Sequence, residues 1–223
     1  MKVFFLILIV FLSGCSLVQP KLTPEQVREK TQKVIEIIQS QPEWLFSGAD
    51  ACPAEVIPET EKKIKYQGEG CANNPESCLE KCKADDGNAC YALALFLQEQ
   101  KGADDKNPEP LFLRSCRLGI ISGCTNRAAV ISNQEIADAQ ARKCAADTFE
   151  NTCARDDAWG CTMYGGALAF GDGREENKKE ALKFLAKACQ YTSSDESPAC
   201  KYARDIEAVL KSEKIETVPP KKH

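Results

Sequence analysis

The sequence predicts an all-α fold, an α-solenoid of helix-pair repeats that are stapled together by disulfides. The main observation is a cysteine pair with seven residues between its members, which recurs at steps of 34 and 37 residues. A fourth pair with a longer loop begins 36 residues after the third pair. The pairs are Cys82 and Cys90, Cys116 and Cys124, Cys153 and Cys161, and Cys189 and Cys200. A period of this length is typical of a solenoid built from one repeated unit.

The N-terminus predicts that the chain is exported. Lys2 precedes an apolar run of ten residues, 3–12, which is too short to span a hydrocarbon core of about 30 Å as a helix. Such a run after a positive charge is typical of a secretory signal. The segment Leu12-Ser13-Gly14-Cys15 resembles the lipobox of bacterial lipoproteins, which implies a signal peptide over residues 1–14 and lipidation of Cys15. The alternative is an ordinary secretory signal with an unrelated cysteine.

The lipobox resemblance implies a place in the bacterial cell envelope. Ser16 stands where an aspartate would favour retention in the inner membrane, so we expect a lipid anchor in the outer membrane and a periplasm-facing chain. Without Cys15, twelve of the thirteen cysteines remain. An even number in an exported chain predicts a disulfide framework. With 29 Lys and Arg against 33 Asp and Glu, the chain lacks the positive charge that a nucleic-acid partner requires.

The segment before the repeats, residues 15–70, is interpreted as an N-terminal helix and a connector. Residues 22–40 have a helix start at Thr23-Pro24-Glu25 and apolar residues at helical spacing, which predict an amphipathic helix. Residues 44–70 contain Pro53, Pro58 and Gly68 and carry Cys52, so they predict an irregular connector that can pack on the first repeat as a cap.

The repeat array is predicted over residues 71–211, with a flexible tail over 212–223. The motif Asn74-Pro75-Glu76 combines a helix cap, a proline at the first helical position and an acidic residue, and Asn107-Pro108-Glu109 repeats it 33 residues later. The expected helices are 90–99, 110–118, 124–132, 134–153, 159–170, 177–190 and 198–211. Each cysteine pair would then join the second helix of one repeat to the first helix of the next. We expect Leu93, Phe96 and Leu97 to pack against Phe112 and Leu113.

Several motifs resemble one repeat of the disulfide-rich Sel-one-like family, which is TPR-like and known from the Helicobacter cysteine-rich proteins. They are Trp159-Gly160-Cys161, Tyr164-Gly165, Gly171-Asp172-Gly173 and the stretch from Glu180 to Cys189. Residues 87–116 follow the same outline. The unit from Cys124 to Cys153 fits less well because it carries an extra cysteine, Cys144, and its register stays open. Cys52, Cys71, Cys78 and Cys144 allow three pairings, of which a bond from Cys52 to the array is favoured.

The sequence predicts no catalytic residues, metal site or cofactor. The one histidine, His223, is the final residue, which argues against a histidine-based triad or zinc site. Ser-x-x-Lys, Lys-Thr-Gly, Gly-x-Ser-x-Gly and the phosphate-binding Gly-x-x-x-x-Gly-Lys motif are absent from the sequence. The paired carboxylates Asp85-Asp86, Asp104-Asp105 and Asp156-Asp157 are expected to cap helices or face solvent.

These observations favour an interaction scaffold whose partner is an envelope protein, a peptide or a peptidoglycan fragment. Solenoids of helix pairs present a concave face lined by their first helices, so contacts are expected on exposed positions of 90–99, 124–132 and 159–170. The family resemblance implies an alternative, a penicillin-binding protein with weak β-lactamase activity, although no nucleophile or metal ligand set for amide hydrolysis is recognisable. A purely structural role in envelope maintenance is the third hypothesis.

Overall fold

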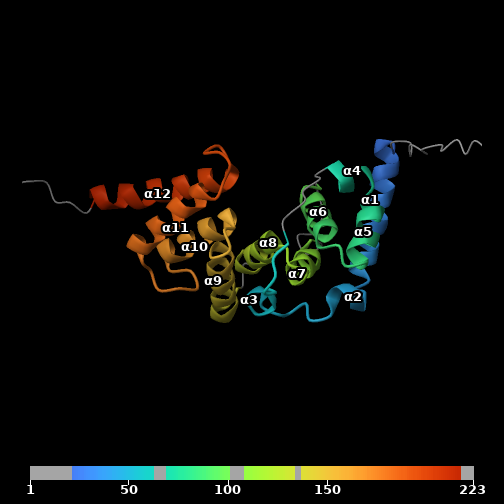
Figure 1. The fold of residues 1–223 in the computed structure, drawn as a ribbon, viewed down its shortest axis with the longest axis horizontal. Helices are drawn as coiled ribbons and strands as arrows, with labels where there is room; N and C mark the ends of the chain where they lie inside the picture. Colours follow the sequence, from blue (N-terminus) through green and yellow to red (C-terminus); the bar gives the residue numbers. More distant parts are fainter. Residues whose placement is uncertain (1–21, 63–68, 101–107, 134–136, 217–223) are drawn as a thin grey trace, which may run out of the picture.

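A computed structural model describes residues 22–62, 69–100, 108–133 and 137–216 (Figure 1). Every regular element within these residues is an α-helix. In this part of the chain, no helix combines the length and the apolar character that a membrane span needs. The expected signal peptide, Cys15, the pair Asp104-Asp105 and His223 lie outside the described residues.

The helices follow one another with short connections. Their bounds are α1 Pro24–Gln39, α2 Glu43–Phe46, α3 Pro53–Val56, α4 Glu69–Asn73, α5 Pro75–Lys83, α6 Gly87–Gln98, α7 Glu109–Arg117, α8 Ile121–Ser132, α9 Ala139–Cys153, α10 Ala158–Phe170, α11 Lys178–Gln190 and α12 Pro198–Glu216.

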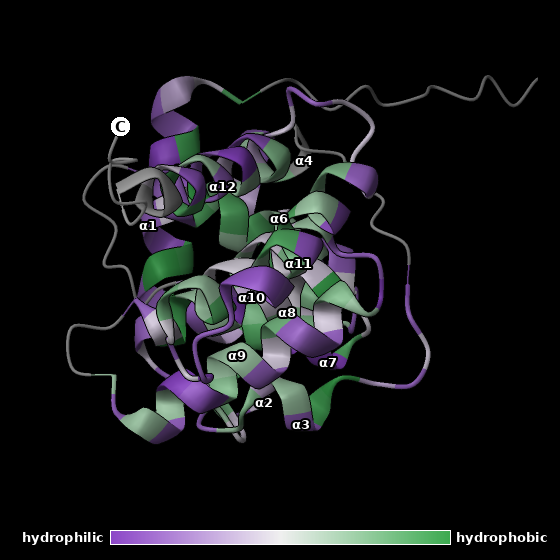
Figure 2. Cartoon of the chain, turned by 90° about the vertical axis from the view of Figure 1, so that its left-hand side faces the viewer, coloured by the Kyte–Doolittle hydropathy of each residue, from purple (hydrophilic) through white to green (hydrophobic). Residues whose placement is uncertain are grey.

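The array consists of the helix pairs α6/α7, α8/α9 and α10/α11, each of which packs on the next. From α5 to α12, each helix contacts its successor, and α12 also packs on α10 as the last helix (Figure 1). One buried cluster lies in the N-terminal half and includes Leu93, Leu97 and Phe112, with Phe96 partly buried against it. A second cluster lies among α8 to α12. Hydrophilic residues occupy many of the outer turns in the view along the array (Figure 2).

The same turn joins the helices at three of the bridges. Asp85, Gly119 and Asp156 all have a positive φ, between 62° and 90°, at the equivalent position of the turn. The next residue in each case donates its N–H to a carbonyl five residues back, as Asp157 does to Thr152. This geometry is the Schellman ending of a helix, which satisfies carbonyls that the helix leaves free.

Aspartates after this turn start the following helices, and this explains a shift from the expected boundaries. The Asp86 carboxylate accepts from the N–H groups of Asn88 and Ala89, and the Asp157 carboxylate accepts from Gly160 N–H. Helices α6 and α10 therefore begin before Cys90 and Trp159, where the sequence analysis placed their starts. As expected, Asp86 and Asp157 act here as caps, while Asp85 and Asp156 are exposed.

Three other boundaries were wrong. Helix α8 begins at Ile121 instead of residue 124, directly after the turn at Gly119. Helix α9 begins at Ala139 instead of residue 134, because the Asp138 side chain accepts from Ala141 N–H at 2.7 Å and fixes the helix start there. Helix α12 continues to Glu216, so the tail does not begin at residue 212. Residues 212–216 contain no proline or glycine, and glutamate and lysine favour the helix.

The connector after α1 differs most from the expectation. Instead of capping the first repeat, it crosses the array, and α3 packs against α7, α8 and α9. Helix α1 packs on α5 instead, at the N-terminal end of the array (Figure 1). The disulfide Cys52–Cys144 ties the connector to α9 across 92 residues of sequence.

Candidate functional site: a groove between the connector and the array

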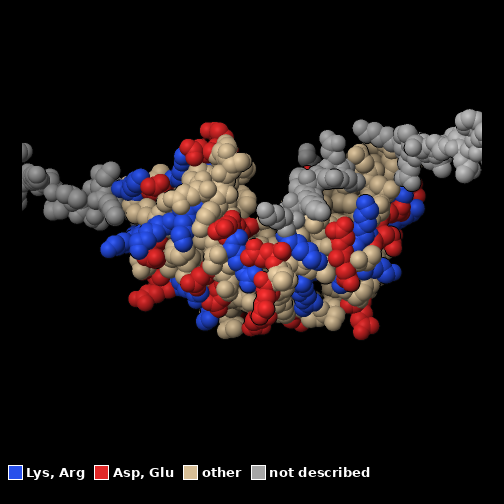
Figure 3. Space-filling model, viewed as in Figure 1, with Lys and Arg blue, Asp and Glu red and all other residues tan. Residues whose placement is uncertain are grey.

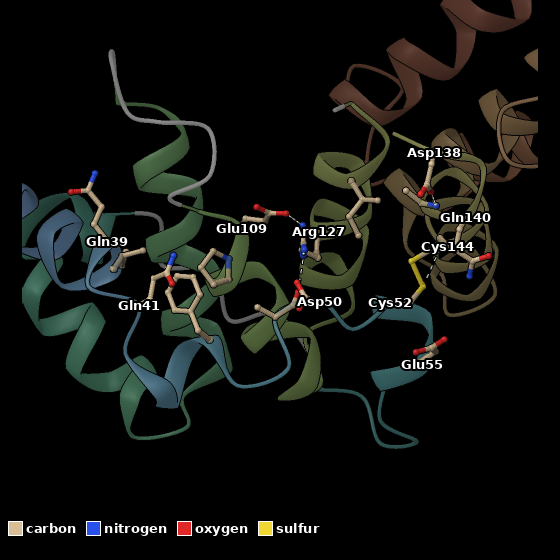
Figure 4. Close-up of a pocket in the computed structure, with 16 residues that line it drawn as sticks. Gln39, Gln41, Asp50, Cys52, Glu55, Glu109, Arg127, Asp138, Gln140 and Cys144 are labelled. Atoms are coloured by element: carbon tan, nitrogen blue, oxygen red, sulfur yellow. Dashed lines mark hydrogen bonds and ion pairs between the residues drawn. A yellow bond between two sulfur atoms is a disulfide. The ribbon is translucent and has the colours of Figure 1, made fainter. Parts of the chain in front are cut away.

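The connector and the array enclose an elongated groove of about 950 Å³ (Figure 4). Gln39 and Gln41 lie at one end, Glu109, Arg127 and Asp50 lie in the middle, and the Cys52–Cys144 bridge lies toward the other end. Its lining comes from α1, the connector, α7, α8 and α9: Ile38, Gln39, Gln41, Phe46, Ala49, Asp50, Cys52, Glu55, Glu109, Pro110, Arg127, Ile131, Asp138, Gln140, Ala141 and Cys144.

Arg127 joins three elements in the middle of the groove. Only 9% of this residue is exposed. Its guanidinium forms an ion pair with Glu109 of α7 and donates from Nη2 to the carbonyl oxygen of Ala49 at 3.2 Å. Burial lowers the pKa of Arg127 to about 10, while the nearby Asp50 carboxylate opposes this shift. Arg127 is therefore still protonated at neutral pH, and its charge holds the connector to the array.

Three further arginines bind the connector through its backbone. Arg114 donates to Trp44 O at 2.7 Å. Arg117 donates to the carbonyl oxygens of Ser47 and Gly48, both at 2.5 Å. Arg155 donates to Pro58 O at 2.9 Å. Since charge-assisted hydrogen bonds are the stronger ones, these contacts fix the path of an otherwise irregular segment.

The far wall is fixed covalently and by one hydroxyl group. Cys52 is bonded to Cys144, with their Cα atoms 5.8 Å apart. Beside the bridge, Thr148 is fully buried, accepts from Ala54 N–H at 3.1 Å and donates to Cys144 O at 2.8 Å. The buried hydroxyl group of Thr148 is therefore hydrogen-bonded, and the disulfide fixes the distance between α3 and α9.

The structure bonds the four cysteine pairs named from the sequence, Cys82–Cys90, Cys116–Cys124, Cys153–Cys161 and Cys189–Cys200. The remaining two bridges are Cys52–Cys144 and Cys71–Cys78. Because Cys153 bonds with Cys161 and Cys144 bonds with the connector, the register of the α8/α9 repeat is settled. In the described residues, no cluster of three histidine, cysteine or acidic side chains is placed to hold a metal ion.

The groove only partly coincides with the surface expected from the sequence. Of the three helices expected to contact a partner, α8 contributes Arg127 and Ile131 to the lining, and α6 and α10 contribute none. Trp159 of α10 is 38% exposed and its ring lies 6.2 Å from that of Tyr202 on α12, away from the groove lining. The contributions of α1, the connector, the start of α7 and the first half of α9 were not predicted from the sequence. An arginine inside the otherwise weakly polar helix α8 was the available signal.

These features define a class: an all-α repeat protein whose helix pairs are stapled by disulfides and crossed by a bonded connector. Comparison with protein-family models gave no match, and none of the curated proteins matches. Among solved structures, Helicobacter pylori cysteine rich protein B matches at 22% sequence identity and a TM-score of 0.42, over 62% of this chain and 98% of that chain. The fold assignment rests on the helices, turns and bridges described above.

Proposed function

We propose that this protein is a lipid-anchored repeat scaffold of the bacterial cell envelope, facing the periplasm, which binds an extended segment of a partner protein. The observation that carries the proposal is the elongated groove between the connector and the array (Figure 4). Its volume of about 950 Å³ lies near the upper end of the range for ligand pockets.

The chemistry of the lining suits a peptide backbone. Gln39, Gln41 and Gln140 are exposed along the groove, and each amide offers both donors and an acceptor to the N–H and C=O groups of a bound segment. Phe46 and Ile131 add partly buried apolar surface to the lining. The disulfide and the arginine contacts hold the connector backbone against the array before binding, which reduces the ordering cost of association.

The experiment that tests this function blocks the groove at an exposed position. Gln140→Trp places an indole in the groove, and Gln190→Trp makes the same change at an exposed position of α11 outside the lining. We expect chemical crosslinking in envelopes to trap a partner with the unmodified protein and with Gln190→Trp, and to lose it with Gln140→Trp. Equal crosslinking by both variants would contradict a role for the groove.

Nitrocefin hydrolysis by the same purified proteins distinguishes the scaffold from an enzyme. Turnover above about 1 per second, the low end of ordinary enzyme rates, would contradict the scaffold function and show that the protein is a hydrolase.

A further inference from the structure

The charges on the groove are strongly unequal. Four carboxylates and one guanidinium line it, those of Asp50, Glu55, Glu109, Asp138 and Arg127. On the face of the molecule in Figure 3, by contrast, acidic and basic side chains are interspersed. The ion pair between Arg127 and Glu109 neutralises two of the five groups. The lining is left with an excess of negative charge from Asp50, Glu55 and Asp138.

These three carboxylates are exposed. Arg127, the cation near Asp50, is paired with Glu109, and the cations near Asp138 are paired with other carboxylates. Asp138 accepts from Ala141 N–H with one oxygen and so caps α9. Among the described residues, neither Asp138 nor Glu55 has an ion-pair partner. Arg142 and Lys143 follow closely on α9, but Arg142 pairs with Asp172 at 2.9 Å and Lys143 pairs with Asp147 at 2.7 Å. The groove therefore keeps its negative charge in the folded protein.

The remaining lining restricts what kind of cation fits. Asp50 lies in the middle, and Glu55 and Asp138 lie near the bridge end (Figure 4). Exposed amides lie toward both ends, those of Gln39 and Gln41 at the end opposite the bridge and that of Gln140 near Asp138 (Figure 4). A linear ligand with cationic groups spaced along a hydrogen-bonding backbone complements this arrangement better than a single compact cation does.

We propose that the groove selects a basic segment of a partner protein, whose lysine or arginine side chains meet Asp50, Glu55 and Asp138 while its backbone meets the glutamine amides. This inference rests on the proposed function and adds the charge of the partner to it. Charge complementarity of this kind contributes specificity and speeds association.

The test uses three short fluorescent peptides in which alanine alternates with lysine, glutamine or glutamate, titrated with the purified chain by fluorescence anisotropy. We expect the lysine peptide to bind about tenfold more tightly than the glutamine peptide and the glutamate peptide to bind least. Added salt should weaken only the binding of the lysine peptide, because salt screens exposed charges.

Two matched double variants assign the effect to the groove. Glu55→Gln with Asp138→Asn removes two carboxylates while asparagine keeps the α9 cap. It should weaken binding of the lysine peptide about fivefold to tenfold and leave binding of the glutamine peptide unchanged. Asp195→Asn with Glu196→Gln makes the same charge change in the loop before α12 and should have no effect.

Equal affinity for all three peptides would overturn the charge inference and leave peptide binding by the groove intact. Failure of every peptide to bind would also overturn it. Crosslinking of Gln140→Trp in envelopes then decides the proposed function separately, because that experiment does not depend on the charge of the partner.

Discussion

Single residues decide where the connector lies on the array. Arg127 is the most buried of the four arginines that bind connector carbonyls, and it is also paired with Glu109, whose side chain is 17% exposed. Two charges at this depth stabilise the fold only as a pair, because each has lost most of its hydration.

Removing one member of this pair should therefore cost more than removing both. We expect Arg127→Met to lower the free energy of unfolding by about 3 kcal/mol or more, since Glu109 is left without its partner in a buried position. The double variant Arg127→Met with Glu109→Met should recover part of that loss, as measured by urea denaturation. Arg142→Met is the control, because its pair with Asp172 is about half exposed and is worth about 1 kcal/mol or less.

Some contacts of single residues could be predicted from the sequence, and others could not. The capping role of Asp86 and Asp157 could be predicted, because a helix needs an acceptor at its start and the repeat places an aspartate there. The contact between Arg127 and Ala49 could not be predicted, because 78 residues separate the two and no periodic pattern links them. An arginine within α8 indicates that an acceptor lies nearby, but it does not identify the residue that provides it.

At the scale of elements, α10 and α11 approach closely because a glycine, Gly165, faces the contact. A Cβ atom added at Gly165 would lie 2.7 Å from Leu185 Cδ2 and 3.3 Å from Ala181 O. A Cβ atom at the adjacent Gly166 would meet only Ile206 Cδ1, at 3.5 Å. The two glycines therefore serve different purposes in the same helix.

Alanine substitutions should separate these two glycines. Gly165→Ala is expected to lower the free energy of unfolding by about 1–3 kcal/mol, because the new methyl group overpacks the contact with Leu185. Gly166→Ala is expected to raise it by about 0.5–1 kcal/mol through the better helix propensity of alanine. Thermal melts followed by circular dichroism measure both. Destabilisation of equal size at the two positions would contradict the close packing at Gly165.

The disulfides also join one element to another, but the loops that they close differ greatly in length. Cys52–Cys144 spans 92 residues and Cys82–Cys90 spans 8. In the chain-entropy model, the longer loop contributes about 4.6 kcal/mol and the shorter about 2.5 kcal/mol. Replacing both cysteines of a pair with alanine should therefore cost about 2 kcal/mol more for Cys52–Cys144, as urea unfolding of the two variants measures. The opposite order would contradict the model for this chain.

On the scale of the whole molecule, the fold could be predicted because the sequence is periodic. The groove could not be predicted, because the segment that forms one side of it has no periodic pattern. The cysteine spacing gave the helix pairs and the four bridges between neighbouring helices, because a local loop of fixed length brings each pair together. The groove depends on residues 38–55, which belong to no repeat and reach α9 only through tertiary contacts. The prolines in this segment indicated an irregular path without showing its direction.

The anchor is the other property of the whole molecule that we propose, and it rests on Leu12-Ser13-Gly14-Cys15. Cys15→Ser should abolish incorporation of labelled fatty acid and move the protein from the membrane fraction to the soluble fraction, since the thiol that carries the lipid is lost. Fractionation followed by immunoblotting checks this. Unchanged membrane partitioning of Cys15→Ser would contradict lipidation at this residue.

The connector bonded across the array is the central claim, because both the groove and its charge depend on it. Peptide mapping of the purified protein without reduction tests this claim most directly. We expect a disulfide-linked peptide that contains Cys52 and Cys144, together with Cys71–Cys78 and the four bridges between neighbouring helices. A bond from Cys52 to Cys71 or Cys78, or a bond from Cys144 to Cys153, would contradict it, because the connector would then be free of α9 and the groove would lose its wall.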